Sequence, residues 1–326
     1  MSLDFLMCSE RSGSNFITKL LNGHSNICGP STKHIFNPVL RNLFRYEPLS
    51  RKENWEALLE DLFQLIDVSF SIWKHTFTKK DLRDLAPRGD INSLLRNIFF
   101  EEAKEFGKQH IFVKENQIYE FLPYLLIHFS ESKYIYQVRD PRDMALSWKK
   151  NPVHPGGVVK AARQWRKDQQ NNLKNFNELK KRNKGYLVTY ENLISKPEKY
   201  TQKLVNFLGL TYEPGMMAFH EDRLTQQNAN MQKAWNNLSK SVISDNKKKY
   251  QDQLTEREIK IIEKICFFEM RYLDYETEFE WEELKSISDQ EVELLNKKEL
   301  ERIELKRTNG VVKNMEAKKI FYQQLL

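Results

Sequence analysis

The chain begins with an apolar run that leads, through a small polar loop, into an amphipathic segment. Residues 3–8 are apolar apart from Asp4 and predict a buried strand, and the loop after them contains Arg11 and Gly13. Apolar positions of the next segment recur at helical spacing: Phe16, Ile17, Leu20 and Leu21. A strand, a loop and a helix in this order direct backbone N–H groups and the positive end of the helix dipole to one point. The pattern therefore predicts a binding site for a phosphate or sulfate group.

Three later apolar runs predict further strands, at residues 110–114, 133–138 and 186–189. Helical patterns separate the strands, with residues 36–107 mostly helical and a long polar helix over 158–182. Strands that alternate with helices are typical of a parallel sheet covered on both faces. We therefore expect an α/β fold of three layers, a parallel sheet flanked by helices, with a P-loop-like turn after its first strand.

Polar residues follow the ends of these predicted strands. Lys114 ends the second apolar run, Arg139 follows the third, and Tyr190 follows the fourth. Ligands of parallel α/β sheets bind at the carboxyl ends of the strands. We therefore expect these side chains and the opening loop to lie along one edge of the sheet.

The remainder of the chain is less regular. Residues 225–250 are polar with little periodicity and predict an extended loop, whereas 254–272 predict a helix. We expect one domain over residues 1–275, with a helical insertion at about 36–107. Residues 276–326 are strongly charged and predict a helical extension that is solvated or contacts a partner or a second copy of the chain.

Composition narrows the function classes only slightly. A chain of 326 residues with 40% hydrophobic content can bury a full core, and its net charge of +7 suits an anionic ligand as well as a merely basic surface. Cys8, Cys28 and Cys266 show no paired spacing, which argues against a zinc site or a disulfide framework. The sequence has no signal-peptide pattern and no apolar run long enough for a membrane span. We expect a cytoplasmic protein that binds no nucleic acid.

The opening loop departs from the nucleoside-triphosphate pattern G-x-x-x-x-G-K-[ST] at two positions. Cys8 stands at the first glycine and Ser14 at the lysine, while the cationic side chain is Arg11, inside the loop. Such a loop can bind a phosphate and neutralise a leaving oxygen. It lacks the groups that serve a metal-bridged triphosphate, and we expect no metal ion.

Two motifs together resemble the sulfotransferases that use 3′-phosphoadenosine 5′-phosphosulfate (PAPS). The first motif covers residues 10–15, and the second, R-D-P-R-D-x-x-x-S, runs from Arg139 to Ser147. The resemblance implies that Arg139 and Ser147 bind the 3′-phosphate. It also implies that the first loop binds the 5′-phosphosulfate through Arg11, Ser12, Gly13, Ser14 and Asn15.

The resemblance extends over most of residues 3–275. At residues 188–193 it implies that Tyr190 lies near the adenine, and at 237–240 that Ser239 and Lys240 close over the nucleotide. The charged extension lies outside it.

The charge of the donor gives an independent reason for two cationic loops. PAPS carries two separated anions, and Arg139 can bind one of them through a planar fork that lysine cannot match. Arg11 and the N–H groups of its loop can stabilise charge on the bridging oxygen as the sulfur–oxygen bond breaks. The alternative for Arg139 is a surface ion pair with Asp140 or Asp143.

The catalytic base is less clear from the sequence. Relatives often carry glutamate in the loop after the first helix, where this chain has Ser31 and Thr32, or histidine after the strand lysine, where it has Asn116. The remaining candidates are His34 and Glu115, and we favour His34 because the resemblance puts its loop beside the acceptor. Lys114 would support the sulfuryl oxygens.

We therefore predict a PAPS-dependent sulfotransferase whose acceptor is an alcohol, a phenol or a carbohydrate. One alternative is a P-loop kinase that uses ATP and magnesium, which the missing lysine and glycine disfavour. The other is a non-catalytic polyanion- or nucleotide-binding protein, which leaves the spacing of the two loops unexplained.

Overall fold

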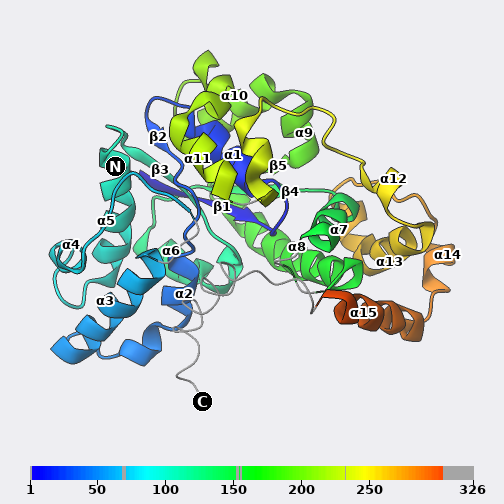
Figure 1. Cartoon of the computed structure of the whole chain (residues 1–326), viewed down its shortest axis with the longest axis horizontal. Coiled ribbons are helices and arrows are strands. Elements are labelled where there is room, and N and C mark those ends of the chain that lie inside the picture. The colour runs from blue at the N-terminus through cyan, green and yellow to red at the C-terminus, as the bar shows by residue number, and fades with distance from the viewer. Residues whose placement is uncertain (1, 68–70, 152–153, 155, 232, 304–326) are drawn as a thin grey trace.

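The computed structural model describes residues 2–67, 71–151, 154, 156–231 and 233–303 (Figure 1). Five parallel strands form one sheet in the order β2-β3-β1-β4-β5. The strands are β1 (Ser2–Cys8), β2 (Ile27–Cys28), β3 (His110–Lys114), β4 (Tyr134–Val138) and β5 (Gly185–Thr189). The predicted α/β fold with a parallel sheet flanked by helices is confirmed.

Helices connect and cover the strands. Those up to β4 are α1 (Ser14–Asn22), α2 (Phe36–Arg41), η1 (Leu43–Tyr46), α3 (Lys52–Asp67), α4 (Lys79–Asp84), α5 (Ile91–Lys104), η2 (Ile118–Glu120) and α6 (Leu122–His128). The next are α7 (Pro141–Lys150), α8 (Val158–Lys181), α9 (Tyr190–Ser195), α10 (Pro197–Leu208), η3 (Pro214–Glu221), α11 (Arg223–Met231) and η4 (Lys233–Ser239). The last are α12 (Tyr250–Gln253), α13 (Glu256–Tyr272), α14 (Trp281–Lys285) and α15 (Asp289–Ile303).

The two faces of the sheet belong to two hydrophobic clusters because successive strand side chains point to opposite faces. Leu6 and Cys8 of β1 pack with α1 and α10 in one cluster. Phe5 and Met7 of the same strand pack with α2, α5 and α8 in the larger cluster. This arrangement gives the three layers that the alternation of strands and helices predicts.

The carboxyl ends of the strands lie side by side. Leu6 of β1 pairs with Lys114 of β3, Cys8 of β1 pairs with Gln137 of β4, and Val138 of β4 pairs with Thr189 of β5. The loops that follow β1, β3, β4 and β5 therefore leave the same edge of the sheet.

The segments outside the sheet form two groups of helices. Residues 36–107 contain α2, η1, α3, α4 and α5, and Figure 1 shows α3 to α5 on one side of the molecule. On the other side α13, α14 and α15 gather next to α7 and α8 (Figure 1). The described part of the charged extension is therefore packed against the domain, while residues 304–326 lie outside the described residues.

The extended loop predicted for residues 225–250 is wrong over its first half, where α11 and η4 form. The buried positions of α11 are Thr225, Asn228 and Ala229, which are polar or small. Asn228 accepts a hydrogen bond from the Ile72 N–H at 2.8 Å and donates one to the Ile72 carbonyl at 2.9 Å. Hydrogen bonds rather than an apolar stripe hold this helix, so the periodicity of apolar residues does not reveal it.

Candidate active site

The loop after β1 has a backbone that few residue types adopt. Gly13 has φ 86° and Arg11 has φ 63°, both in the left-handed region. A Cβ atom on Gly13 would lie 2.4 Å from the ring of Tyr190, so only glycine allows this close approach. The Ser12 hydroxyl donates to the Ser9 carbonyl at 2.7 Å and closes the loop. A non-glycine residue held at positive φ is typical of functional loops.

Arg139 lies directly beside this loop. Its Nη1 donates to the Arg11 carbonyl at 3.2 Å, and its Nη2 donates to the Asn246 carbonyl at 3.3 Å. Its guanidinium stacks over the Tyr190 ring at 4.5 Å, and the Tyr190 hydroxyl accepts a hydrogen bond from Asn246 at 2.7 Å. Arg139 is only 9% exposed, and its buried Nε has no hydrogen-bond partner in the described part of the chain.

Ser147 joins the two predicted anion loops. It lies on α7, and its hydroxyl accepts a hydrogen bond from Arg11 Nε at 3.1 Å. The pKa of Arg11 is lowered, first by burial and then by repulsion from Arg139. Among the described residues neither guanidinium forms an ion pair with a carboxylate. Two adjacent cations, of which Arg139 is buried and Arg11 half-buried, that form no ion pair among the described residues favour an anionic ligand.

The alternative for Arg139, an ion pair with Asp140 or Asp143, is absent from the described residues because other groups occupy both carboxylates. Asp140 pairs with Arg142 at 2.7 Å. Asp143 accepts hydrogen bonds from the backbone N–H groups of Lys248 at 2.6 Å and Tyr250 at 3.1 Å. The carboxylates of the second motif hold the structure around Arg139 without forming an ion pair with it. Burial raises the pKa of Asp143, and the charge of Arg139 partly offsets that rise.

His34 and Glu115, the two alternative bases, form a pair. His34 Nδ1 lies 2.6 Å from Glu115 Oε1, and Glu115 Oε2 accepts the Phe36 N–H at 3.0 Å. Glu115 is 1% exposed, and His34 is held at φ 55°. A carboxylate fixed in this way orients the imidazole.

Lys114 ends β3 beside β1 and is largely buried. Its ammonium forms no hydrogen bond or ion pair with any residue of the described ranges. Its charge acts on the Cys8 thiol and on His154, which places it near the end of β1. Lys114 is therefore available to an anion at this edge of the sheet.

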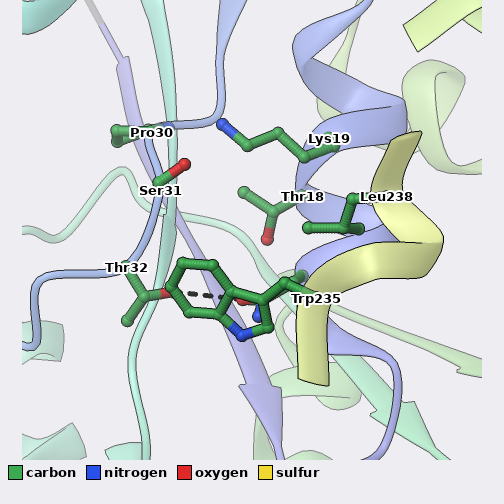
Figure 2. Close-up of a pocket in the computed structure, with 8 residues that line it drawn as sticks. Thr18, Lys19, Pro30, Ser31, Thr32, Trp235 and Leu238 are labelled. Carbon is green, nitrogen blue, oxygen red and sulfur yellow. Dashed lines mark hydrogen bonds between the residues drawn. The ribbon is translucent and has the colours of Figure 1, made fainter. Parts of the chain in front are cut away.

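Ser14 and Asn15 begin α1. Asn15 Oδ1 accepts a hydrogen bond from Thr32 at 3.4 Å. Figure 2 shows Thr32 and Ser31 facing α1 across a narrow crevice, with the Trp235 indole beside them. The crevice has a volume of about 10 Å³, which is roughly the room for one water molecule. It is too small for an acceptor in this conformation.

Ser239 and Lys240 are not brought to the two arginines. Both are exposed at the end of η4, and the Ser239 hydroxyl donates to the Asn236 carbonyl at 2.8 Å. Asn246 lies at the Arg139–Tyr190 contact instead. In the sequence, Asn246 ends a polar run and precedes three lysines. This context contains no motif that marks Asn246 as a site residue.

A second histidine–carboxylate pair was also missed by sequence reasoning. His154 Nδ1 lies 3.3 Å from Glu10 Oε2, and Asn116 donates to Glu10 Oε1 at 2.7 Å. His154 stacks on Trp148 at 4.3 Å. Burial lowers the pKa of His154 to about 4, so its imidazole is neutral at pH 7. Glu10 belongs to the first motif, which was the one available signal.

In the described residues no group of three or more His, Cys, Asp or Glu side chains is arranged to hold a metal ion. No helix in those ranges combines the length and hydropathy that crossing a membrane requires.

Comparisons with solved structures agree with this fold. A sulfotransferase domain from the curacin biosynthetic pathway matches at a TM-score of 0.56 and 20% identity, over 85% of this chain and 99% of that chain. The sulfotransferase domain of the Synechococcus PCC 7002 olefin synthase matches at 0.52 and 19%, over 82% of this chain and 94% of that chain. These likenesses show the fold.

A search of curated proteins found no match. The sequence profile of the sulfotransferase family, in contrast, matches residues 5–214. This span is well over half of the 326 residues and contains both anion loops. The resemblance stated from the two motifs is confirmed, and the chain belongs to the sulfotransferase family.

Proposed function

We propose that the protein transfers a sulfuryl group from PAPS to an acceptor hydroxyl, releasing adenosine 3′,5′-bisphosphate. The observation that carries this proposal is the adjacent pair Arg11 and Arg139, whose side chains form no ion pair with a carboxylate in the described ranges. Arg139 donates to the Arg11 carbonyl and stacks on Tyr190, while Arg11 donates to Ser147. The unpartnered Nε of Arg139 adds a donor that suits a phosphate oxygen.

Each residue has a defined part in this reaction. Arg139 and Ser147 bind the 3′-phosphate, while Arg11, Ser12, Gly13, Ser14 and Asn15 hold the 5′-phosphosulfate. Tyr190 packs against the adenine side of the site. Arg11 and Lys114 stabilise negative charge on the bridging and sulfuryl oxygens as the sulfur–oxygen bond breaks. Ser239 and Lys240 remain candidates for closing over the nucleotide. They would do so only after η4 moves toward the two arginines.

His34 is the proposed general base. A Glu115 carboxylate that accepts from Nδ1 makes Nε2 the basic nitrogen of the imidazole. The acceptor oxygen forms its new bond to sulfur, the bond from sulfur to the bridging oxygen breaks, and the acceptor proton passes to His34 Nε2. Glu115 then stabilises the imidazolium, so the two candidates for the base, His34 and Glu115, act as one functional pair.

A thermal-shift titration tests the donor. We expect adenosine 3′,5′-bisphosphate to raise the melting temperature without magnesium, because a ligand that binds only the folded state stabilises it by mass action. Equal or greater stabilisation by magnesium–ATP would favour the kinase instead. A similar response to unrelated polyanions such as heparin would favour a non-catalytic polyanion-binding protein.

Turnover of labelled donor tests the base. We expect His34→Ala to lower kcat by about 100-fold or more with little change in bisphosphate affinity. Glu115→Gln should lower kcat less, because the amide still accepts a hydrogen bond from the imidazole. Unchanged turnover in His34→Ala would remove His34 as the base, and His154→Ala, measured alongside, would then test the second histidine of the site. The acceptor itself is to be found among alcohols, phenols and carbohydrates by incubating the enzyme and labelled donor with cell extract.

A further inference from the structure

One helix contacts both anion loops. The indole Nε1 of Trp165 on α8 donates to the Arg139 carbonyl at 2.9 Å. One turn later, Gln169 Nε2 donates to the Ser9 hydroxyl at 2.8 Å. Trp165 and Gln169 are each 1% exposed. The loop after β4 and the loop after β1 are therefore both hydrogen-bonded to the same face of one rigid element.

The contact of Gln169 is fixed from several directions. Its Oε1 accepts a hydrogen bond from the Tyr136 hydroxyl on β4, and its Nε2 also contacts the Trp165 carbonyl at 3.2 Å. The Ser9 carbonyl in turn accepts from Ser12, inside the first anion loop. Buried groups whose hydrogen bonds are satisfied in this way have little freedom to move. Gln169 therefore transmits the position of α8 to the loop that contains Arg11.

The start of α8 is held by the C-terminal helix. Gly157 precedes α8 and supplies no capping side chain. The Glu299 carboxylate of α15 accepts hydrogen bonds from the Val158 N–H at 2.9 Å and the Val159 N–H at 3.3 Å. A Cβ on Gly157 would lie 2.0 Å from the Glu299 carboxyl carbon, so glycine makes this approach possible. Glu299 is 6% exposed and satisfies N–H groups that the helix itself leaves unpaired.

A second contact fixes α15 along α8. Arg163 of α8 pairs with Glu293 of α15, and Val292 of α15 is buried in the large hydrophobic cluster. The charged extension is therefore packed in a defined position against α8, the helix that carries Trp165 and Gln169.

We propose that α8 sets the spacing between the two anion loops, with Trp165 and Gln169 as positioning residues and Glu299 of α15 fixing the first turn of the helix. This inference rests on the proposed function, because the spacing matters only for a ligand with two anionic groups. A ligand with a single phosphate needs only one loop and is insensitive to the distance between them.

The test compares three ligands on the full-length protein by calorimetric titration: adenosine 3′,5′-bisphosphate, adenosine 5′-monophosphate and adenosine 3′-monophosphate. For Trp165→Phe and for Gln169→Met we expect bisphosphate affinity to fall roughly fivefold to tenfold, the size of one buried hydrogen bond. The affinity for each monophosphate should change by less than about twofold.

The matched control is Trp73→Phe. Trp73 is also buried and donates its Nε1–H to a backbone carbonyl, that of Ser31, at 2.6 Å, but it does not lie on α8. It should leave the affinity for all three ligands unchanged. A fall in the monophosphate affinities as large as that in the bisphosphate affinity would overturn the spacing role, and so would an unchanged bisphosphate affinity in both α8 variants.

Glu299 gives the second arm of the test. We expect Glu299→Ala to lower bisphosphate affinity by about threefold, which is the scale of a charge at a helix N-terminus. Glu299→Gln should restore part of it, because the amide oxygen still accepts one N–H. An unchanged affinity in Glu299→Ala would remove α15 from the proposal. Wild-type protein that binds none of the three nucleotides would instead refute the proposed function itself.

Discussion

Arg139 and Arg142 stand three residues apart in the same motif, and both are buried. Arg142 forms ion pairs with Asp140 and Glu263, each at 2.7 Å, and stacks over Tyr250 at 4.3 Å. Arg139 has two backbone carbonyls and an aromatic ring around it, and forms no ion pair with a carboxylate of the described residues. The same residue type therefore stabilises the framework in one place and, as we propose, binds a ligand in the other.

The difference follows from the direction that each side chain takes. Arg142 lies in the first turn of α7 and reaches α13, where the carboxylates compensate the cost of burying its charge. Arg139 precedes α7, at the edge of the sheet where the loop after β1 also ends. Near Arg139 the charge of Arg11, which Glu10 offsets only in part, adds to the cost. An anion bound between the two arginines would offset that cost.

Removing the framework arginine should have the largest effect. Arg142→Met leaves Asp140 and Glu263 buried without a cation, and we expect the free energy of unfolding to fall by about 3–5 kcal/mol. Chemical denaturation would measure it. Arg142→Lys, which keeps a charge without the planar fork, should lose less; an Arg142→Met protein as stable as wild type would break the distinction drawn between the two arginines.

Removing the ligand arginine should act on binding. We expect Arg139→Met to weaken adenosine 3′,5′-bisphosphate binding by about 3 kcal/mol, roughly 150-fold, because a charged fork to the 3′-phosphate is lost. The free energy of unfolding should change by no more than about 1 kcal/mol, since no ion pair is broken. Titration calorimetry and denaturation of the same sample separate the two effects. A large loss of stability with unchanged binding would show that Arg139 stabilises the fold and does not bind the ligand.

A buried carboxylate far from the site gives the smallest expected effect. Burial raises the pKa of Asp4, near the start of β1, to about 6, against its usual value near 3.8. The folded protein therefore keeps the proton between about pH 4 and 6 while the unfolded chain loses it, so stability falls as the pH rises through this window. Asp4→Asn should remove that slope and raise stability at pH 7 by roughly 2 kcal/mol.

Donor binding serves as the control for Asp4→Asn. Asp4 lies at the amino end of β1, opposite the anion loop, and its Oδ1 accepts the Lys133 N–H at 2.7 Å, a bond that asparagine can keep. Bisphosphate affinity should therefore equal that of wild type. A stability that is unchanged at pH 7 would show that the Asp4 carboxyl is not buried as described.

Local sequence predicts the position of the two loops that we propose for the donor, because each loop directly follows a strand. Arg11 and Arg139 meet because β1 and β4 are neighbours, and the edge they share is a property of any parallel sheet. The pair formed by His34 and Glu115 joins residues 81 positions apart. No local pattern encodes that distance, which is why the sequence leaves the two as separate candidates.

Contacts made late in the chain were the hardest to predict. Asn246 reaches Arg139 through its backbone carbonyl, a group that every residue type has. Glu299 caps α8 from 141 positions away, and in the sequence it is one of many charges in a polar extension. The contacts of such residues depend on where the fold places them. Their side-chain type alone therefore does not reveal these contacts in the sequence.

The ion pair between Arg142 and Glu263 affects the order in which the protein folds during synthesis. Its partner Glu263 lies 121 residues downstream, so translation needs roughly 6 to 25 s to make it at ordinary elongation rates. The last strand, β5, is complete at Thr189, well before then. A nascent chain can thus complete the five described strands while Arg142 still lacks one of its two carboxylate partners. The turn beside Arg139 is fully anchored only once α13 has been made.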